Sequence, residues 1–303
     1  MAENTGSGGP IFVLGMLQRS GTNFLRDLLA AHPHCQGSDS LAEDHLVHHA
    51  ELLAQYSGWV GSHWANHADP EEVDRLEADL LQSIGRGLRE FIARSVGGVR
   101  PVLKTPSVRN VDLFFRLFDD ASLLILVRDG RSMVESGMRS FGWDFEEATR
   151  NWATAADRIA AFRTAMGDRT RGWRIVRYED LLTDSNELRD ILAAVSLDAD
   201  LYDFESVQRI PVKGSSSYKR TGGDVHWQPV EPGADFQPLN RWADWSESQH
   251  ARFNWLAGDQ MKALGYELVE SAAGGSRPMW NRYRDGSWFA RRVRKRLLAR
   301  VRR

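Results

Sequence analysis

Two short segments combine arginine with small polar residues, and each follows a run of apolar residues. The first is QRSGTNFL at residues 18–25, after IFVL at 11–14, and the second is VRDGRSMVES at residues 127–136, after SLLIL. Arginine can fork onto phosphate oxygens through two N–H groups, and serine and threonine hydroxyls add further donors. These residue types therefore indicate sites for a phosphate-bearing ligand.

The first segment has the pattern of a strand, a tight turn and a helix. Gly15 and Gly21 border the turn, and apolar residues then recur at helical spacing over 25–29. The backbone N–H groups of residues 20–23 should lack partners at the start of this helix, beside Arg19. Such a place is typical of anion binding, most often of phosphate. The alternative interpretation is an ordinary turn with two flexible glycines.

The loop GMLQRSGT departs from the P-loop of nucleoside triphosphatases, which requires G-x-x-x-x-G-K-[ST]. Gly15 and Gly21 are one residue too far apart, and Thr22 follows Gly21 without a lysine. The apolar strand expected at 122–127 ends in Arg128 instead of a metal-binding acid. A sulfuryl group in transfer carries less negative charge than a phosphoryl group, so arginine and lysine can stabilise it without Mg²⁺. The pattern favours a sulfuryl donor, with a P-loop kinase-like phosphotransferase as the alternative.

Both segments resemble motifs of sulfotransferases that use 3′-phosphoadenosine 5′-phosphosulfate (PAPS). QRSGTNFL resembles their 5′-phosphosulfate loop and VRDGRSMVES their 3′-phosphate motif, in the family's order. The RSGT core and VRDGR are most similar to the tyrosylprotein and carbohydrate branches, and the resemblance covers most of residues 10–266. It implies PAPS as co-substrate, no metal, and in-line transfer to a hydroxyl of a small-molecule, glycan or glycolipid acceptor.

The resemblance also implies roles for individual residues. Arg128 and Ser136 would hold the 3′-phosphate, Tyr178 would touch the nucleotide, and Lys104 would stabilise the oxygen that leaves from phosphate. The late loop at 213–220 resembles the segment that closes over the nucleotide. The residues implied at the 5′-phosphosulfate are Arg19, Ser20, Gly21, Thr22 and Asn23, and those implied in the late loop are Lys219 and Arg220.

Transfer to an alcohol requires a general base near the acceptor hydroxyl. In the branches that this chain resembles, a carboxylate after the first helix has this role, whereas in the cytosolic branch a histidine does. Asp39, Glu43, Asp44 and His45 all lie in that part of the sequence. We choose Glu43, because SLAEDHL should carry it to the start of the next helix near the first strand. The spacing differs from the tyrosylprotein pattern, and the other three residues remain alternatives.

The intervening elements should bring these residues to one edge of a sheet. Strands separated by helices predict an α/β fold, a doubly wound parallel sheet of four to five strands with helices on both faces and a P-loop-like turn. The residues at 211–238 are rich in Gly, Ser and Pro and are typical of a lid or of disorder. The expected strands are 11–14, 99–104, 122–127 and 173–178, and helices should start at Asp69, Asp144 and Ser246.

Composition further limits the kinds of protein that this sequence can encode. The chain has 303 residues, 42% of them hydrophobic and 26% charged, and a single cysteine, which excludes an internal disulfide framework. No apolar run is long enough to cross a membrane, and the sequence MAENTGSGGP has no signal-peptide pattern, so we expect a cytoplasmic protein. His45, His48 and His49 have a spacing that zinc could use, but no supporting acid or cysteine is evident, and we expect no metal.

The last residues form an electrostatically separate part. Residues 277–303 hold 11 of the 39 basic residues and one of the 41 acids, which leaves a net charge of about −12 elsewhere. We expect a flexible start at 1–9, an α/β domain at 10–270 and a basic amphipathic tail at 271–303 that binds the inner surface of an anionic membrane. Alternatives are a partner docking site, contact with nucleic acid, or packing on the acidic body. Because the body is acidic, nucleic acid is not an expected partner. A non-catalytic, membrane-associated nucleotide-binding protein is the third functional hypothesis.

Overall fold

The computed structural model describes residues 8–169, 171–184, 186–207, 210, 239–270 and 278–301, with the backbone alone for 278 and 295–301. The chain divides into two compact units, Met1–Arg241 and Trp242–Arg303. The late loop that the sequence singled out, with Lys219 and Arg220, lies outside the described residues.

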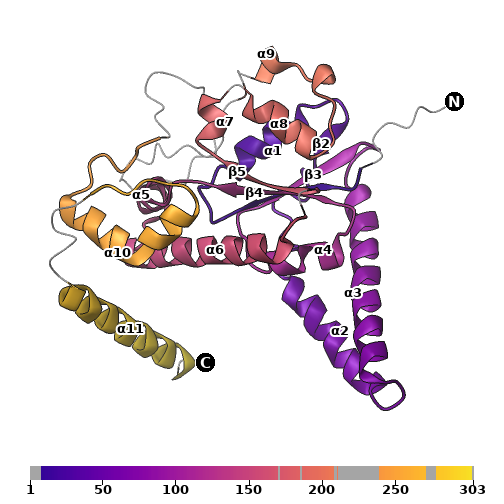
Figure 1. Cartoon of the computed structure of the whole chain (residues 1–303), viewed down its shortest axis with the longest axis horizontal. Coiled ribbons are helices and arrows are strands. Elements are labelled where there is room, and N and C mark those ends of the chain that lie inside the picture. Colours follow the sequence, from indigo (N-terminus) through magenta and orange to yellow (C-terminus); the bar gives the residue numbers. More distant parts are fainter. Residues whose placement is uncertain are drawn as a thin grey trace. The chain divides into compact units, whose positions relative to one another are not determined.

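A parallel sheet of five strands forms the centre of the first unit (Figure 1). The order is β2-β3-β1-β4-β5, and every neighbouring pair is parallel, as predicted for a doubly wound fold. The strands β1, β3 and β4 are buried throughout, which explains the nearly unbroken apolar sequences of β1 and β4. The strand β3 is buried as well, although it includes Arg100, Lys104 and Thr105. The strands are β1 (Ile11–Gly15), β2 (Cys35–Gly37), β3 (Arg100–Thr105), β4 (Ser122–Val127) and β5 (Trp173–Arg177).

The helices of this unit cover both faces of the sheet. Figure 1 shows α1, α7 and α8 on one side and α4 and α6 on the other, while α2 and α3 form a hairpin that extends away from the sheet. Short 3₁₀ turns occupy Val111–Leu113 and Ala199–Leu201. The helices are α1 (Thr22–Ala30), α2 (Ala50–Trp64), α3 (Pro70–Ala93), α4 (Phe114–Leu117), α5 (Gly130–Phe141), α6 (Phe145–Met166), α7 (Asp180–Thr183), α8 (Glu187–Ala194) and α9 (Phe204–Val207).

The helix starts follow from capping residues that the sequence displays. The Asp69 carboxylate accepts a hydrogen bond from the Glu72 N–H at 2.9 Å, and Asp144 accepts one from the Glu147 N–H at 2.9 Å. Each pairing satisfies an amide at the first turn of a helix, α3 and α6 respectively.

The edge strand β2 was not predicted. It has three residues, of which only Cys35 is buried, and it pairs with the start of β3. Such a short segment, with an exposed glutamine and a glycine, has no alternating pattern, and its sequence predicts a loop. Its strand conformation depends on the hydrogen bonds that β3 supplies.

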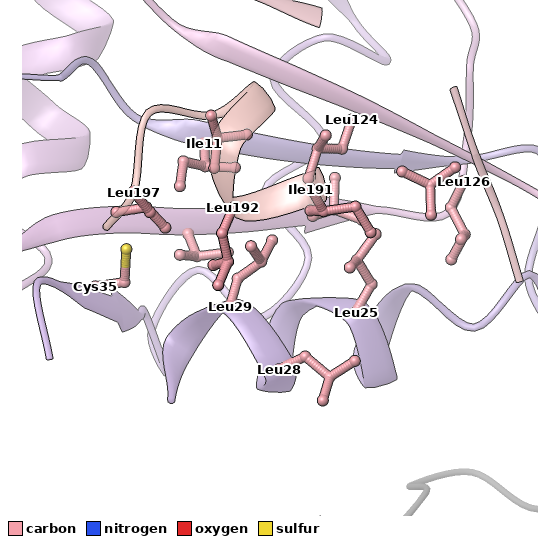
Figure 2. Packing of buried hydrophobic residues seen from close by; sticks show 14 of the residues in the cluster. Ile11, Leu25, Leu28, Leu29, Cys35, Leu124, Leu126, Ile191, Leu192 and Leu197 are labelled. Atoms are coloured by element: carbon pink, nitrogen blue, oxygen red, sulfur yellow. The ribbon is translucent and has the colours of Figure 1, made fainter. Parts of the chain in front are cut away.

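One face of the sheet is fixed by a dense apolar cluster between the strands, α1 and α8 (Figure 2). Figure 2 shows Leu25 and Leu29 of α1 directed toward Ile191 and Leu192 of α8, with Leu124 and the other strand residues beside them. All five side chains are fully buried. Because this packing anchors α1 along its length, the turn between β1 and α1 is held at the carboxyl edge of the sheet.

The second unit contains α10 (Glu247–Ala263) and α11 (Pro278–Val301). Ser246 and Gln249 form the capping box that the sequence predicts at the start of α10. Among the described residues, no helix combines the length and the apolar character that crossing a bilayer demands.

Candidate active site

The turn after β1 contains two glycines that the neighbouring atoms require. At Gly21 φ is +99°, and a Cβ there would lie 2.5 Å from the ring of Tyr178. At Gly15 a Cβ would lie 2.6 Å from the side chain of Thr22. Close approach and a left-handed backbone both favour glycine. The turn is therefore packed directly against Tyr178, which follows β5.

Ser20 closes this turn from inside. Its hydroxyl donates to the carbonyl of Leu17 at 2.5 Å and accepts from the Leu17 N–H at 3.2 Å. The Ser20 N–H also donates to the Leu17 carbonyl, at 3.3 Å. The prediction that the Ser20 amide lacks a partner is therefore wrong, because the turn folds back on itself two residues before the helix.

Among the residues that the structure describes, no side chain caps the start of helix α1. Gly21 is its N-cap residue, and the first turn, with Thr22 and Asn23, contains no acid. The starts of α3 and α6 differ, since each has a capping aspartate and two glutamates in the first turn. The positive end of α1 thus remains available to an anion from outside the chain.

The two predicted phosphate motifs meet at this turn. Arg128, at the end of β4, donates from Nη1 to the carbonyl of Arg19 at 2.7 Å. Arg19 donates from Nε to the hydroxyl of Ser136 on α5 at 3.0 Å. The guanidinium of Arg128 also lies over the Tyr178 ring, 4.3 Å from its centroid. The structure thus gathers Arg19, Arg128, Ser136 and Tyr178 in one place, and their roles in binding remain predictions.

A further arginine of the same unit joins this cluster. Burial, and then the nearby positive charges of Arg241 and Arg128, lower the pKa of Arg19 to about 10. Burial and the charge of Arg128 likewise lower the pKa of Arg241 to about 10. An anion with several oxygens would offset the repulsion among these guanidinium groups.

Arg241 was not predicted from the sequence. It lies beside Trp242, shortly after the Gly-, Ser- and Pro-rich stretch. Nothing in that short pattern distinguishes it from a surface residue. Its place in the cluster depends on where residues 239–241 return to the body of the first unit.

Asp129 of the VRDGR motif has a structural role. Its Oδ1 accepts from the N–H groups of Arg131 at 2.8 Å and Ser132 at 3.3 Å, which caps α5. Its Oδ2 pairs with Arg131 Nη2 at 2.6 Å. The carboxylate thereby fixes the start of the helix that carries Ser136.

Lys104 and Glu43 form an ion pair at the adjacent strand end. The Lys104 Nζ lies 2.6 Å from Glu43 Oε1, and Lys104 is buried whereas the side chain of Glu43 is 37% exposed. In the sheet, Lys104 is paired with Val13 of β1, shortly before the turn. Burial lowers the pKa of Lys104 below 10.5, and the Glu43 carboxylate opposes this shift.

The structure separates the four candidate bases. Asp44 accepts from the Thr105 hydroxyl at 2.9 Å and from the Leu46 N–H at 2.9 Å, and burial raises its pKa. It therefore ties its loop to the end of β3. The Nε2 atom of His45 lies 3.4 Å from Oε2 of Glu43. Asp39 is exposed. Of the four, Glu43 is the carboxylate joined to the predicted catalytic lysine.

The histidines after Glu43 lie close together. The rings of His48 and His49 are 4.7 Å apart, and His48 Nδ1 lies 2.8 Å from the Ser107 hydroxyl. Within the part of the chain that the structure describes, no group of three or more His, Cys, Asp or Glu side chains is placed to hold a metal ion.

A cavity of about 300 Å³ lies beside the turn, between residues 17–18 and the start of α6. The indole of Trp143 stacks on Phe141 with ring centroids 5.7 Å apart, and Phe141 in turn lies 5.7 Å below the guanidinium carbon of Arg19. The cavity is thus joined to the arginine cluster by aromatic contacts. Its lining residues are Leu17, Gln18, Trp143, Asp144, Glu147, Ala148 and Asn151.

Comparisons with solved structures return several sulfotransferases. The chain is 18% identical to a sulfotransferase domain from the olefin synthase of Synechococcus PCC 7002, with a TM-score of 0.45 and coverage of 96% of this chain and 98% of that one. It is 14% identical to sulfotransferase STF9 from Mycobacterium avium, with a TM-score of 0.48 and coverage of 86% and 78%. It is 11% identical to mouse sulfotransferase SULT7A1 complexed with PAP, with a TM-score of 0.46 and coverage of 84% of both chains.

No curated protein matches the sequence. The profile described as "Sulfotransferase family" matches residues 10–200, which contain the turn after β1, Lys104, Arg128, Ser136 and Tyr178. That range spans well over half of the chain, and this protein therefore belongs to the sulfotransferase family.

Proposed function

We propose that this protein transfers the sulfuryl group of PAPS to a hydroxyl group of its acceptor. The observation that carries the proposal is the meeting of Arg19, Arg128 and Ser136 at the uncapped start of α1, next to the Lys104–Glu43 pair. Two anionic ends of one nucleotide require two cationic sites at neighbouring strand ends, and this cluster has the charge and the hydrogen-bond donors for both.

The donor site divides between the turn and α5. The backbone N–H groups at the start of α1 suit the 5′-phosphosulfate, since they are uncapped and lie at the positive end of the helix. Arg128, Arg241 and Ser136 suit the 3′-phosphate, because guanidinium and hydroxyl donors can share its oxygens. The Tyr178 ring, stacked on Arg128, keeps that guanidinium in a fixed plane.

Glu43 and Lys104 suit the two oxygens that exchange at sulfur. Glu43 accepts the proton of the acceptor hydroxyl as the new O–S bond forms. Lys104 neutralises the phosphate oxygen as the old S–O bond breaks. In an in-line displacement these two oxygens lie on opposite sides of one sulfur atom, so the base acts at the entering oxygen and the cation at the leaving oxygen. The ion pair between Glu43 and Lys104 shows that both groups lie at the same strand end.

We assign the cavity beside the turn to the part of the acceptor that lies away from the reacting hydroxyl, because its lining includes neither Glu43 nor Lys104. It shares residues 17–18 with the donor turn, and its walls combine the Trp143 indole, the Gln18 and Asn151 amides and the Asp144 and Glu147 carboxylates. An aromatic face with surrounding amides and carboxylates suits a polyhydroxylated ring, neutral or cationic. The carboxylates disfavour an anionic acceptor. We therefore favour a small glycan or aminosugar hydroxyl over an already sulfated one.

Calorimetry with 3′-phosphoadenosine 5′-phosphate, AMP and ATP, each with and without Mg²⁺, tests the donor. We expect the bisphosphate to bind more tightly than AMP and without a metal requirement. ATP binding that depends on Mg²⁺ would contradict the proposal and favour a phosphotransferase.

A transfer assay with PAPS and a panel of alcohols tests the acceptor. Neutral sugars and aminosugars should accept sulfate, and glucuronate-containing sugars should be poor acceptors. The double variant D144N/E147Q should narrow this difference. Nucleotide binding without transfer to any hydroxyl would favour a non-catalytic role.

A further inference from the structure

The helix α11 has two faces of different chemistry, and the acid-bearing face is the covered one. Asn281, Asp285, Trp288 and Arg292 are half-buried, and they recur at the spacing of a single helix face. The residues between them are largely exposed. The orientation of α11 within the second unit is therefore defined by polar contacts.

Those contacts come from α10. The buried Arg252 donates to Asp285 Oδ1 at 2.6 Å and to Asn281 Oδ1 at 3.0 Å. The Trp255 indole N–H donates to Asp285 Oδ2 at 2.9 Å. Asp285 is the single acid among residues 277–303, so α10 engages the carboxylate that would otherwise repel an anionic surface.

The opposite face of α11 carries large apolar side chains in water. Met279 is 83% exposed, Tyr283 67%, Phe289 66% and Val293 40%. Their positions, together with Gly286 and Ala290, follow one stripe along the helix. An apolar stripe of this length is unusual on the surface of a soluble protein and is typical of an interaction site.

Cations border this stripe. Arg282, Arg291 and Arg294 are exposed, and the sequence continues with Lys295, Arg296 and Arg300. Apolar side chains flanked by arginines match the boundary between the acyl chains and the headgroups of an anionic bilayer. Nucleic acid would use the arginines but would leave the methionine, phenylalanine and valine in water.

We propose that the exposed face of α11 binds the surface of an anionic lipid membrane, with α10 holding the helix so that its apolar stripe faces the lipid. Charge complementarity and the exposed stripe select this partner together. The proposal does not depend on the proposed sulfotransferase activity, because it uses none of the residues assigned to that site.

The test is co-sedimentation of the full chain with vesicles of phosphatidylcholine, with and without phosphatidylglycerol. We expect binding to the anionic vesicles and much weaker binding to the neutral ones. The variant F289S/V293S should lower the affinity roughly tenfold or more, because two apolar side chains no longer enter the interface. R291Q/R294Q should lower it by about tenfold and flatten the salt dependence.

Matched variants on the α2–α3 hairpin provide the controls. L52S/Y56S removes exposed apolar side chains from α2, and R75Q/R86Q removes exposed arginines from α3, so neither should change vesicle binding. Equal losses in tail and hairpin variants would overturn the proposal. It would also fail if the chain bound duplex DNA in preference to vesicles and F289S/V293S left that binding intact. Unchanged urea unfolding midpoints would show that the substitutions leave the fold in place.

Discussion

The first and second units both present arginines, but the environments of these arginines are opposite. Arg19, Arg128 and Arg241 lie close together. Arg128 is buried and the other two are half-buried, and Ser136, the Arg19 carbonyl and the Tyr178 ring orient Arg19 and Arg128. Those of α11 on its outer face are exposed and spread along a helix.

These two environments let arginine serve two kinds of recognition. Buried and oriented guanidinium groups can select the position and number of phosphate groups on a small ligand, because their geometry is fixed before binding. Exposed arginines on a helix face respond to the density of charge on a surface. Burial and hydrogen bonding, more than the count of arginines, decide which kind of partner a cationic region suits.

Another buried arginine of the first unit, Arg100, clarifies this comparison. Arg100 is also buried, at the amino end of β3, where it donates to the Gly9 carbonyl at 2.6 Å, to the Ser122 hydroxyl at 2.8 Å and to the Val195 carbonyl. Its partners belong to the protein, so its role is to join the chain segments at that edge. Arg19 and Arg128 at the carboxyl edge also have protein partners, but they lie close to Arg241, and a bound anion would offset the repulsion among the three charges.

The largest effect should come from the buried cation closest to the proposed chemistry. K104A should lower kcat by about 100- to 1000-fold, since the leaving oxygen loses its positive partner. Because burial lowers the pKa of Lys104, the protonated fraction falls as pH rises through a value below 10.5, and activity should fall with it. The pH–rate profile of the wild type checks this direction.

The variant K104R provides the matched control for that profile. The intrinsic pKa of arginine is higher than that of lysine, so K104R should retain part of the activity and its alkaline decline should move to higher pH. An identical alkaline limb in the wild type and in K104R would assign the decline to another group.

The next largest effect tests the oriented arginines. R128A should weaken binding of 3′-phosphoadenosine 5′-phosphate by about 10- to 100-fold and remove most of its advantage over AMP, because a charge-assisted pair to the 3′-phosphate is lost. Calorimetry with both nucleotides measures this. R291A on α11 is the control and should leave both affinities unchanged. An undiminished preference in R128A would remove this residue from the site.

A smaller effect tests the backbone that positions the cluster. G98A and G21A both place a Cβ at positive φ, +84° and +99° respectively, but Gly98 has open space around it whereas Gly21 meets Tyr178. G98A should lower the free energy of unfolding by about 1 kcal/mol, and G21A by at least twice that amount, because steric overlap adds to strain. Urea unfolding measures both. Equal losses would mean that the Tyr178 contact imposes no cost.

The smallest effect concerns salt. Raising the ionic strength should weaken vesicle binding severalfold, whereas binding of the bisphosphate nucleotide should change less, because buried charges are screened less than exposed ones. Sedimentation and calorimetry at matched salt concentrations make the comparison. A steeper salt dependence for the nucleotide would reverse the distinction between the two regions.

Much of the fold followed from local patterns. The four longer strands, the helix starts at Asp69, Asp144 and Ser246, and the doubly wound class were all predicted correctly, because apolar runs and capping residues act over a few neighbouring positions. The strand β2 was not, since its conformation depends on β3. The late loop with Lys219 and Arg220 lies outside the described residues, and those two assignments stay predictions.

The candidate site was only partly accessible from the sequence. The motifs around Arg19 and Arg128 were recognisable as short segments, and Lys104 was recognisable as a lysine at a strand end. The contact between Arg19 and Arg128 could not be predicted, because a hydrogen bond between residues 109 positions apart depends on strand order. The different environments of Glu43, Asp44 and His45 also required coordinates, since three consecutive residues differ in burial and partners only after the chain folds. Which of the candidate residues is the base stays a prediction.

Residue types and spacing alone were enough to identify two arginine-containing segments that resemble phosphate motifs, a strand-end lysine and a basic amphipathic tail. These features are local, so residue types and spacing specify them. Folding was needed to bring Arg241 to the first two arginines, to pair Glu43 with Lys104, and to place the acid of α11 against Arg252 with the apolar face exposed. Each of these depends on long-range packing, which fixes the direction of a side chain that the sequence leaves undetermined.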